Sequence, residues 1–391
     1  MVGVEVFVRD IVILLMGAFL GGSVARKFGY PAALGELAVG MAIGPFALGF
    51  IEYSETLVTF AELGAIILLF YIGLDTEAAL LKRYLAPSAL AGIMGALLPL
   101  GLGYYGGLLL GLPQGEALFM GTILTATSIG ITARMLTDLG RLKTKEGMTI
   151  LGAGVVDDVV AILLLSVTLS VLAGEFSLES LGVVLLKAAM FWLIVIVVGV
   201  YLLAKALDRL RAGAESVSLL VLAVGFAGAF FSGELGLSTA IGAFAVGLAL
   251  SAMTRSQDVH ANLQQVFLFF VPIFFVSIGM LIDPRAFVTS LLPGLFITGL
   301  AIIGKVVGCG GMLLGLKYKP MQALTVGVGM IPRGEVGLII AGIGLASGYI
   351  GPDTYLTGVM AVSLTTIIAL PILKMLSKNV KGAQGKGRMN F

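Results

Sequence analysis

Apolar runs of about 20 residues recur from one end of this 391-residue sequence to the other. A helix of that length crosses a hydrocarbon core roughly 30 Å thick and satisfies its own backbone hydrogen bonds there. Only 12% of the residues are charged and 59% are hydrophobic, whereas a soluble domain carries about 25% charge. The sequence therefore predicts an all-α membrane protein, organised as a single transmembrane unit over residues 1–391.

Hydropathy predicts about thirteen transmembrane helices. They lie near residues 8–25, 32–51, 57–74, 85–110, 116–135, 147–173, 180–204, 216–232, 236–253, 264–282, 287–316, 320–347 and 354–376. The first run has the acidic neighbours Glu5 and Asp10 and lacks a basic segment with a cleavage site, so we expect a retained span. The single cysteine, Cys309, excludes an intrachain disulfide.

Basic residues are sorted to one side of these spans. Thirteen spans put the termini on opposite sides, and only Arg9 and Arg285 then lie on the side of the N-terminus. The basic residues on the side of the C-terminus are Arg26, Lys27, Lys82, Arg83, Arg134, Arg141, Lys143, Lys145, Lys205, Arg209, Arg211, Arg255, Lys317, Lys319, Lys374, Lys378, Lys381, Lys386 and Arg388. By the positive-inside rule the N-terminus is external and the C-terminus is cytoplasmic, with a tail over residues 377–391. These residues form no basic stripe, so we expect no nucleic-acid partner.

The chain also repeats internally. Residues 34–44 align with 241–251 at an offset of 207, and a second segment around residue 73 aligns with one around residue 279 at an offset of 206. The matched positions are Gly35, Ala38, Val39, Gly40 and Ala42 in the first pair, and Ile67, Ile72 and Gly73 in the second. The paired spans are seven apart, so the copies have opposite orientation, as in many secondary transporters. The alternative is a coincidental match between helices rich in Gly and Ala.

We expect a first repeat over about 8–173, a linker helix over 180–204 and a second repeat over 216–376. The same offset lays residues 124–130 on residues 331–337. Both segments are polar interruptions within a span. Pro332 cannot donate a backbone hydrogen bond, and the first segment is rich in hydroxyl groups. Two broken, crossing helices that line a transport cavity are therefore predicted.

Two adjacent carboxylates, Asp157 and Asp158, lie about ten residues into the sixth span, hence roughly 15 Å deep. A charge at the bilayer centre costs from about 3 to more than 10 kcal/mol, so such residues are usually paired or functional. Two close carboxylates in a low dielectric can hold protons near neutral pH, and a cation can displace them. Thr127, Ser128 and free carbonyls at the fifth-span break could complete the oxygen shell of Na+. The alternative is that both acids only pair with basic residues.

Further charges lie inside predicted spans: Lys187, Lys305, Arg333 and Glu335, with Glu36 and Glu62 nearer the span entrances. One of the two aspartates is the obvious partner for Lys305. The segment from Gly299 to Lys305 also resembles a phosphate-binding loop, but such a loop needs a Ser or Thr after the lysine, and this chain has Val306 there. Arg333 and Glu335 could pair with each other or neutralise the dipole ends of the broken helices. We expect Glu36 and Glu62 to be packing or entrance residues.

These segments together resemble the Na+/H+ antiporters of the monovalent cation:proton antiporter superfamily, in the NapA-like branch. The resemblance covers nearly the whole chain. It is carried by GELAVGMAIGP (35–45), LGAIILLFYIGLD (63–75), TATSIGITAR (125–134), VVDDVV (155–160), the isolated Lys305 and GVGMIPRGEVGLI (327–339).

The resemblance implies a homodimer in the plasma membrane that exchanges Na+ or Li+ for H+, with no enzymatic activity and no cofactor. Each protomer would have a dimerisation domain and a mobile core domain that moves in an elevator-like cycle. Asp158 would carry the cation and the proton. Asp157 would form a salt bridge with Lys305 that breaks on sodium binding, as in electrogenic members.

Three alternatives remain. A Kef-like K+/H+ antiporter usually replaces the first aspartate and adds a nucleotide-binding domain; here Asp157 is present, and we expect no such domain. A cation channel would need a filter loop, and nothing in the sequence resembles one. A sodium-coupled organic-anion symporter of similar fold would need an added substrate.

Overall fold

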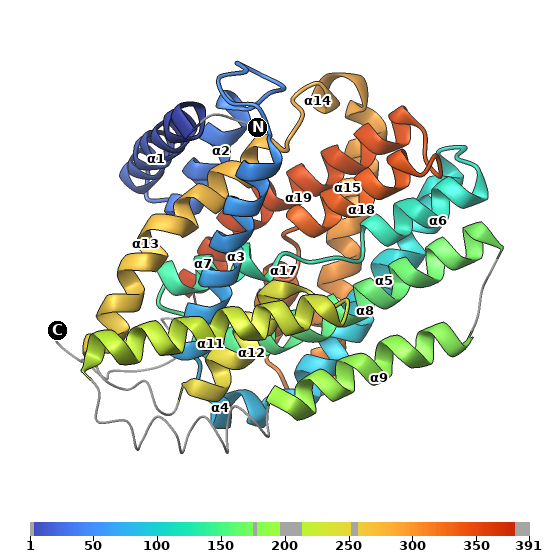
Figure 1. Cartoon of the computed structure of the whole chain (residues 1–391). Coiled ribbons are helices and arrows are strands. Elements are labelled where there is room, and N and C mark those ends of the chain that lie inside the picture. Colours follow the sequence, from blue (N-terminus) through green and yellow to red (C-terminus); the bar gives the residue numbers. More distant parts are fainter. Residues whose placement is uncertain (1–3, 175–177, 196–212, 252–256, 380–391) are drawn as a thin grey trace.

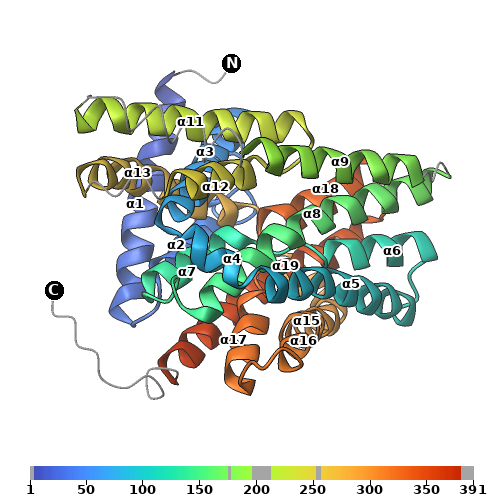
Figure 2. The same cartoon turned by 90° about the horizontal axis from the view of Figure 1, so that it is seen from below.

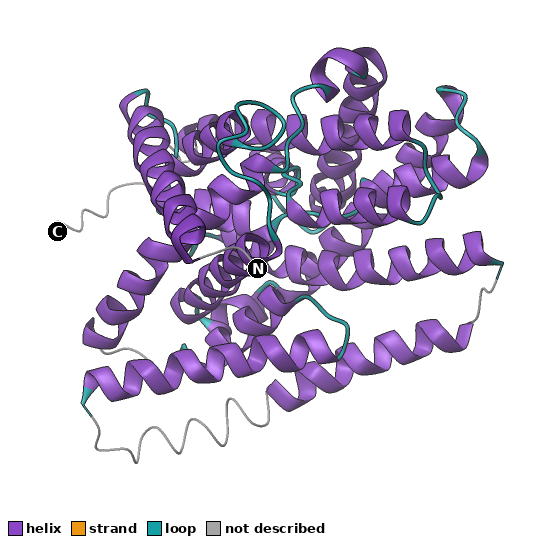
Figure 3. Ribbon diagram, turned by 45° about the horizontal axis from the view of Figure 1, so that its top comes forward, coloured by secondary structure: helices purple, strands orange, loops and turns teal. Residues whose placement is uncertain are grey.

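The computed structural model describes residues 4–174, 178–195, 213–251 and 257–379. In these ranges every regular element is a helix (Figure 3). The helices are α1 (Val4–Lys27), α2 (Ala32–Ile43), α3 (Glu55–Asp75), α4 (Ala78–Arg83), α5 (Leu85–Leu109), α6 (Gln114–Ile123), α7 (Ile129–Asp138), α8 (Lys145–Ala173), α9 (Leu178–Ile194), α11 (Ala214–Glu234), α12 (Thr239–Leu250), α13 (Gln257–Met280), α14 (Ala286–Thr289), α15 (Leu291–Lys305), the π-helical η2 (Val306–Gly311), α16 (Met312–Leu314), α17 (Pro320–Gly329), α18 (Glu335–Ala346) and α19 (Pro352–Asn379).

Seven described helices are long and apolar enough to cross a membrane. Four shorter apolar helices accompany them: Ala32–Ile43, Leu185–Ile194, Thr239–Leu250 and Glu335–Ala346. The chain is therefore an all-helical, multi-pass membrane protein. One of them, Glu335–Ala346, is the second half of an interrupted span.

The described helices form two groups that lie side by side (Figures 1 and 2). In one group α1, α2, α3, α11, α12 and α13 pack on one another. In the other, α5, α6, α8, α15, α17, α18 and α19 do so. One apolar core runs between them, in which Ile67 and Phe274 of the first group share a cluster with Ile129 and Met148.

Helix crossings in the first group are close because glycines occupy them. A Cβ atom on Gly40 of α2 would lie 2.0 Å from the Val276 carbonyl oxygen of α13, and one on Gly73 of α3 would lie 2.4 Å from the Phe244 carbonyl oxygen of α12. Such contacts admit only a residue without a side chain, and they let backbones pack where lipid supplies no hydrophobic drive.

The same arrangement recurs where α1 crosses α2 and where α11 crosses α12. A Cβ on Gly35 would meet the Gly21 carbonyl oxygen at 2.0 Å, and a Cβ on Gly242 would meet the Gly228 carbonyl oxygen at 2.4 Å. Each crossing therefore depends on one glycine from each helix.

Both predicted interruptions are present. The first span stops at Ile123 and resumes at Ile129, and the second stops at Gly329 and resumes at Glu335. The two breaks touch, since the Ser128 amide donates to the Pro332 carbonyl at 2.9 Å.

Some sequence expectations differ from the structure or fall outside it. The expected span 287–316 is not one regular helix, because α14, α15, a π-helical turn and α16 share it. The expected linker helix 180–204 is described only as α9, to Ile194. Most of the predicted tail 377–391 lies outside the described residues. So do several basic residues on which the predicted orientation depends: Lys205, Arg209, Arg211, Arg255, Lys381, Lys386 and Arg388.

Candidate functional site

Helix α8 carries the two adjacent aspartates at its middle. Thr144 caps the start of the helix, since its hydroxyl accepts from the Gly147 amide at 3.1 Å, and Gly174, in the left-handed conformation, caps its end. Asp157 lies twelve residues after the first residue of α8, hence roughly 18 Å along its axis. Its exposed fraction is 0%, and that of Asp158 is 8%. Both carboxylates are therefore held deep inside the protein.

Lys305 ion-pairs with the first of these aspartates. Its Nζ donates to Asp157 Oδ1 at 2.8 Å and to the Thr125 carbonyl oxygen at 2.7 Å, and both charged side chains are fully buried. Lys305 ends α15 and directly precedes the π-helical turn η2, a wide turn that is common at functional sites. The expected pair of Lys305 with one aspartate is present, and it joins α8, α15 and the break after α6.

Two carboxylate oxygens of the pair, Asp157 Oδ2 and Asp158 Oδ1, are buried and have no hydrogen-bond partner among the residues that the structure describes. Buried polar atoms without a partner are rare in proteins. Each costs about 1–3 kcal/mol, and more when the group is charged. These two oxygens are therefore the available ligands for a proton or a cation.

Thr127 and Ser128 lie at the first break, and their hydroxyl groups are directed to the second. Thr127 Oγ1 donates to the Met330 carbonyl oxygen at 3.2 Å, and Ser128 Oγ donates to Glu335 Oε2 at 3.2 Å. Among the described residues neither hydroxyl is hydrogen-bonded to Asp157 or Asp158. In this arrangement they fasten the two breaks to each other.

Arg333 lies at the ends of both broken helices. Its guanidinium donates to the Leu124 carbonyl oxygen from Nη2 at 2.6 Å and from Nε at 3.2 Å, and to the Ile331 carbonyl oxygen from Nη1 at 3.0 Å. Leu124 caps α6, and Ile331 follows the cap of α17, so the positive charge sits where both helix dipoles are negative. Glu335 opens α18, at a positive dipole end.

The sequence left two options for Arg333 and Glu335: an ion pair with each other, or neutralisation of helix dipoles. No ion pair joins them within the described part of the chain, and each lies at a helix end whose partial charge is opposite to its own. A further hydrogen bond holds the break in place, from Thr366 Oγ1 to the Arg333 carbonyl oxygen.

Tyr53, in the loop before α3, is a neighbour of the site that the sequence did not indicate. Burial raises the pKa of Tyr53 to about 12, and the charges of Glu335 and Glu62 act in the same direction. Its hydroxyl is therefore neutral at physiological pH and lies within electrostatic reach of the second break. No periodic pattern marks a loop residue, so only the fold could reveal it.

A second charged cluster lies away from the aspartates, and the position of one of its members, Arg134, differs from the expectation. The sequence places Arg134 at the end of the predicted span 116–135, and we expect it in the loop on the side of the C-terminus. It lies instead inside α7 with an exposed fraction of 9%. Its Nε is 3.2 Å from Asp138 Oδ1, and its guanidinium lies over the Phe267 ring. From sequence alone, a basic residue near the end of a span is indistinguishable from one in the adjoining loop, and only the packing of the helices shows which of the two it is. Glu36 is also buried, and within the described ranges its Oε2 has no hydrogen-bond partner.

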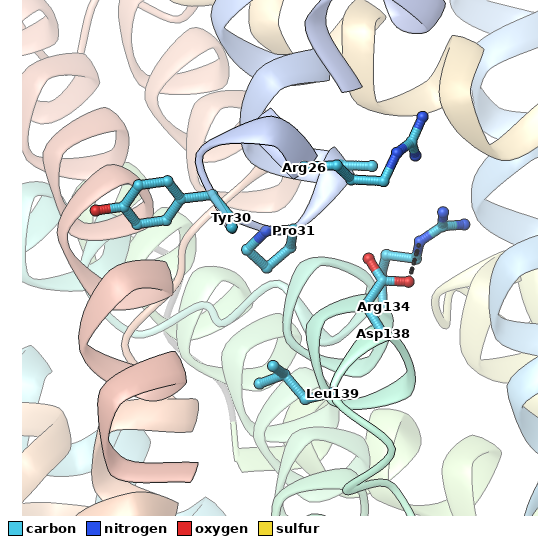
Figure 4. Close-up of a pocket in the computed structure, with 8 residues that line it drawn as sticks. Arg26, Tyr30, Pro31, Arg134, Asp138 and Leu139 are labelled. Carbon is cyan, nitrogen blue, oxygen red and sulfur yellow. Dashed lines mark ion pairs between the residues drawn. The ribbon is translucent and has the colours of Figure 1, made fainter. Parts of the chain in front are cut away.

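Figure 4 shows Arg134 and Asp138 beside Arg26 at a cavity of about 280 Å³. These charges come from α1 and α7, so the cluster joins the first group of helices to the end of a broken helix.

The family of transmembrane sodium/hydrogen exchangers matches residues 12–378. The chain belongs to this family. It is 37% identical over 372 residues to the Na(+)/H(+)-K(+) antiporter GerN of Bacillus cereus, covering 94% of this chain and 95% of that protein. It is 35% identical to a Na(+)/H(+) antiporter of Enterococcus hirae, covering 96% and 99%.

The fold is also that of a solved exchanger. The sodium proton antiporter MjNhaP1 of Methanocaldococcus jannaschii superposes with a TM-score of 0.76 over 98% of this chain and 100% of that chain, at 21% identity. The resemblance to monovalent cation:proton antiporters is therefore confirmed. The family consists of transporters, so the chain is not an enzyme, and its ions are cargo.

Proposed function

We propose that this exchanger moves Na+ across the membrane in one direction and H+ in the other by alternating access, with Asp158 as the carrier of both ions. The observation that carries the proposal is a charge imbalance. Lys305 compensates one of two adjacent buried carboxylates, and among the described residues Asp158 has no ionic partner. An empty, charged Asp158 would be costly to move through a low-dielectric interior. A proton or a Na+ removes that cost, so only the loaded forms cross and the two fluxes are coupled.

Sodium binding engages both free oxygens, Asp157 Oδ2 and Asp158 Oδ1. In this proposal Na+ displaces Lys305 from Asp157, and the ammonium releases its proton to water as a neutral amine. Asp158 has released its own proton on binding the same ion. Two protons then exchange for one Na+, and the cycle moves one net charge, worth about 2.3 kcal/mol per 100 mV.

Inverted repeats over about 8–173 and 216–376 are supported by the glycine crossings. At the offsets of 207 and 206, Gly40 corresponds to Gly247 and Gly73 corresponds to Gly279. The Gly40 Cβ position lies 2.9 Å from the Gly279 Cα, and the Gly247 Cβ position lies 3.2 Å from the Gly73 Cα. One crossing is thus the counterpart of the other, as a pseudo-twofold axis in the membrane plane would require.

The remaining crossings behave in the same way. The Gly21–Gly35 contact corresponds to the Gly228–Gly242 contact at the offset of 207. Ser128 and Glu335 are themselves 207 positions apart and hydrogen-bonded. These pairs support two repeats related by a pseudo-twofold axis. The thirteen spans, the external N-terminus and the cytoplasmic C-terminus are supported by hydropathy and by the sorting of basic residues.

The two groups of helices fit an elevator. We assign the group of α1–α3 and α11–α13 to a dimerisation domain and the group with the breaks and Asp158 to a mobile core. Exposed apolar residues along α1, including Val12, Met16 and Phe19, support a homodimer or lipid contact on that face.

Potassium is the second candidate cargo, because the name of the relative GerN, a Na(+)/H(+)-K(+) antiporter, includes K(+). The intact Asp157–Lys305 pair favours Na+, since it leaves two carboxylate oxygens for a small, hard cation. Jumps of Na+, Li+ and K+ on a solid-supported membrane would separate these options by the size of the current.

The test uses the full chain in proteoliposomes with an imposed proton gradient. We expect uphill Na+ flux in the wild type and none in Asp158→Asn, whose apparent melting temperature should not fall. Asp75→Asn is the control, because the Asp75–Lys143 pair is partly exposed and such pairs contribute about 0–1 kcal/mol. Normal exchange by Asp158→Asn would overturn the carrier assignment. Purely downhill flux would indicate a channel, and flux that needs an added organic anion would indicate a symporter.

A further inference from the structure

An apolar groove follows the outer face of α1 and α2. Leu20, Val24 and Phe28 of α1 form one side, Ala38 of α2 contributes to the other, and Tyr30 closes one end. The groove has a volume of about 390 Å³, and its walls are almost entirely apolar. The exposed fractions of Leu20, Val24 and Phe28 are 54%, 56% and 71%, so within the described chain these side chains are uncovered. We refer to this surface as the α1–α2 groove.

A lysine from a distant helix reaches the end of the α1–α2 groove. The Lys374 Nζ of α19 lies 4.5 Å from the centre of the Tyr30 ring. A second cavity of about 210 Å³ opens there, between Tyr30, Pro371 and Lys374. Lys27 is the last residue of α1. Among the described residues no ion pair includes Lys374 or Lys27, so the end of the groove carries uncompensated positive charge.

The charge cluster of Arg134 and Asp138 does not provide a counterion to this end. Figure 4 shows the Tyr30 ring pointing away from Arg26, Arg134 and Asp138. The cavity that those residues line also includes Gly29 and Tyr30 of the α1–α2 loop, and there Asp138 pairs with Arg134. The end of the α1–α2 groove therefore combines a cation, Lys374, an aromatic ring, Tyr30, and an apolar channel.

We propose that the α1–α2 groove binds an anionic phospholipid, with one acyl chain in the groove and the phosphate beside Lys374 and Tyr30. An apolar channel suits an acyl chain, and basic residues on the side predicted to be cytoplasmic attract anionic headgroups. Tyrosine is favoured at the same level of the bilayer because its ring is amphipathic.

A second copy of the chain fits this surface less well. A twofold contact brings the same patch of both subunits together. The patch around Tyr30 would then place Lys374 and Lys27 near their own counterparts, and like charges repel. An anionic lipid neutralises the same charges.

The experiment measures the apparent melting temperature of the delipidated full chain in detergent. Phosphatidylglycerol, phosphatidylcholine and inorganic phosphate are titrated separately. We expect stabilisation by phosphatidylglycerol alone. Lys374→Gln should raise its half-maximal concentration about fivefold, because one lysine near a lipid headgroup contributes roughly that factor. Ala38→Phe should abolish the stabilisation by filling the groove. If the Phe variant does not fold, the smaller change Ala38→Leu serves instead and should weaken the stabilisation.

Matched controls carry the same substitutions elsewhere. Lys82→Gln on α4 and Ala189→Phe on α9 change exposed residues away from the groove and should keep the wild-type response. Equal responses of the wild type, Lys374→Gln and both Ala38 variants would overturn the proposal. So would stabilisation by inorganic phosphate as large as that by the lipid, which would indicate a free-anion site. A lipid-independent change of oligomeric state in Ala38→Phe would instead make the groove a contact between copies.

Discussion

Replacing Lys305 by Gln tests whether the buried ion pair supports both the fold and the transport charge. The Nζ to Oδ1 distance is 2.8 Å and neither side chain is exposed. With an effective dielectric constant of about 20, two unit charges at that distance attract by about 6 kcal/mol. Desolvation of both ions offsets part of this attraction, and loss of one partner from a buried pair typically costs about 3–5 kcal/mol.

That cost converts into a measurable change in melting temperature. An unfolding entropy of about 2.1 cal/mol/K per residue amounts to roughly 0.8 kcal/mol/K over 391 residues. Lys305→Gln should therefore lower the apparent melting temperature by about 4–6 °C, because Asp157 is left buried and unpaired. The double variant Lys305→Gln/Asp157→Asn removes both charges and should recover most of the loss.

The assay is a double-mutant cycle on purified full-length chain, with current recorded from the same samples on a solid-supported membrane. The single variant Lys305→Gln should retain exchange without net charge movement, since the proposed second proton comes from the lysine. Additive melting shifts in the double variant, or an unchanged current in Lys305→Gln, would refute the reasoning.

Three further perturbations follow from the same geometry. Arg333→Gln removes hydrogen bonds from a buried cation to the ends of both broken helices and should cost about 3–5 kcal/mol of stability. Arg333→Lys should melt at a temperature between those of the wild type and Arg333→Gln. A wild-type melting temperature for Arg333→Gln would contradict this prediction. Ser128→Ala should cost about 1 kcal/mol and change the KM for Na+ by no more than about tenfold, because this hydroxyl binds the other break. Abolished exchange would instead make it an ion ligand. Gly40→Ala places a methyl group 2.0 Å from a carbonyl oxygen of α13 and should prevent folded protein from accumulating, whereas Gly342→Ala, with no atom within 4 Å, should match or exceed the wild type in a detergent solubility assay.

Much of the fold was predictable because membrane insertion depends on local hydropathy. The apolar runs place most spans within a few residues of the helices, as 57–74 does for α3 and 147–173 for α8. The break at Pro332 was also predictable, since proline removes a backbone donor wherever it stands. The interrupted span 287–316 was not, because a π-helical turn has no clear local signature.

The candidate site was predictable in its members and not in its contacts. Asp157 and Lys305 are 148 positions apart, and the residues themselves left either aspartate as the partner of Lys305; only the family resemblance pointed to Asp157. Arg333 reaches a carbonyl 209 positions away. Such pairings depend on which faces of packed helices meet, and a single sequence does not state them. Arg134 shows the reverse error, since its position near a span end concealed its burial.

By itself, the sequence determined that this chain crosses the membrane many times and that two acids and one lysine are buried in it. Hydropathy and the high cost of charge in lipid suffice for both conclusions. Only the tertiary structure decided that Lys305 takes Asp157 and leaves Asp158 without an ionic partner among the described residues. It also decided that Arg333 closes both helix ends, because these choices depend on the packing of α8, α15 and the two breaks.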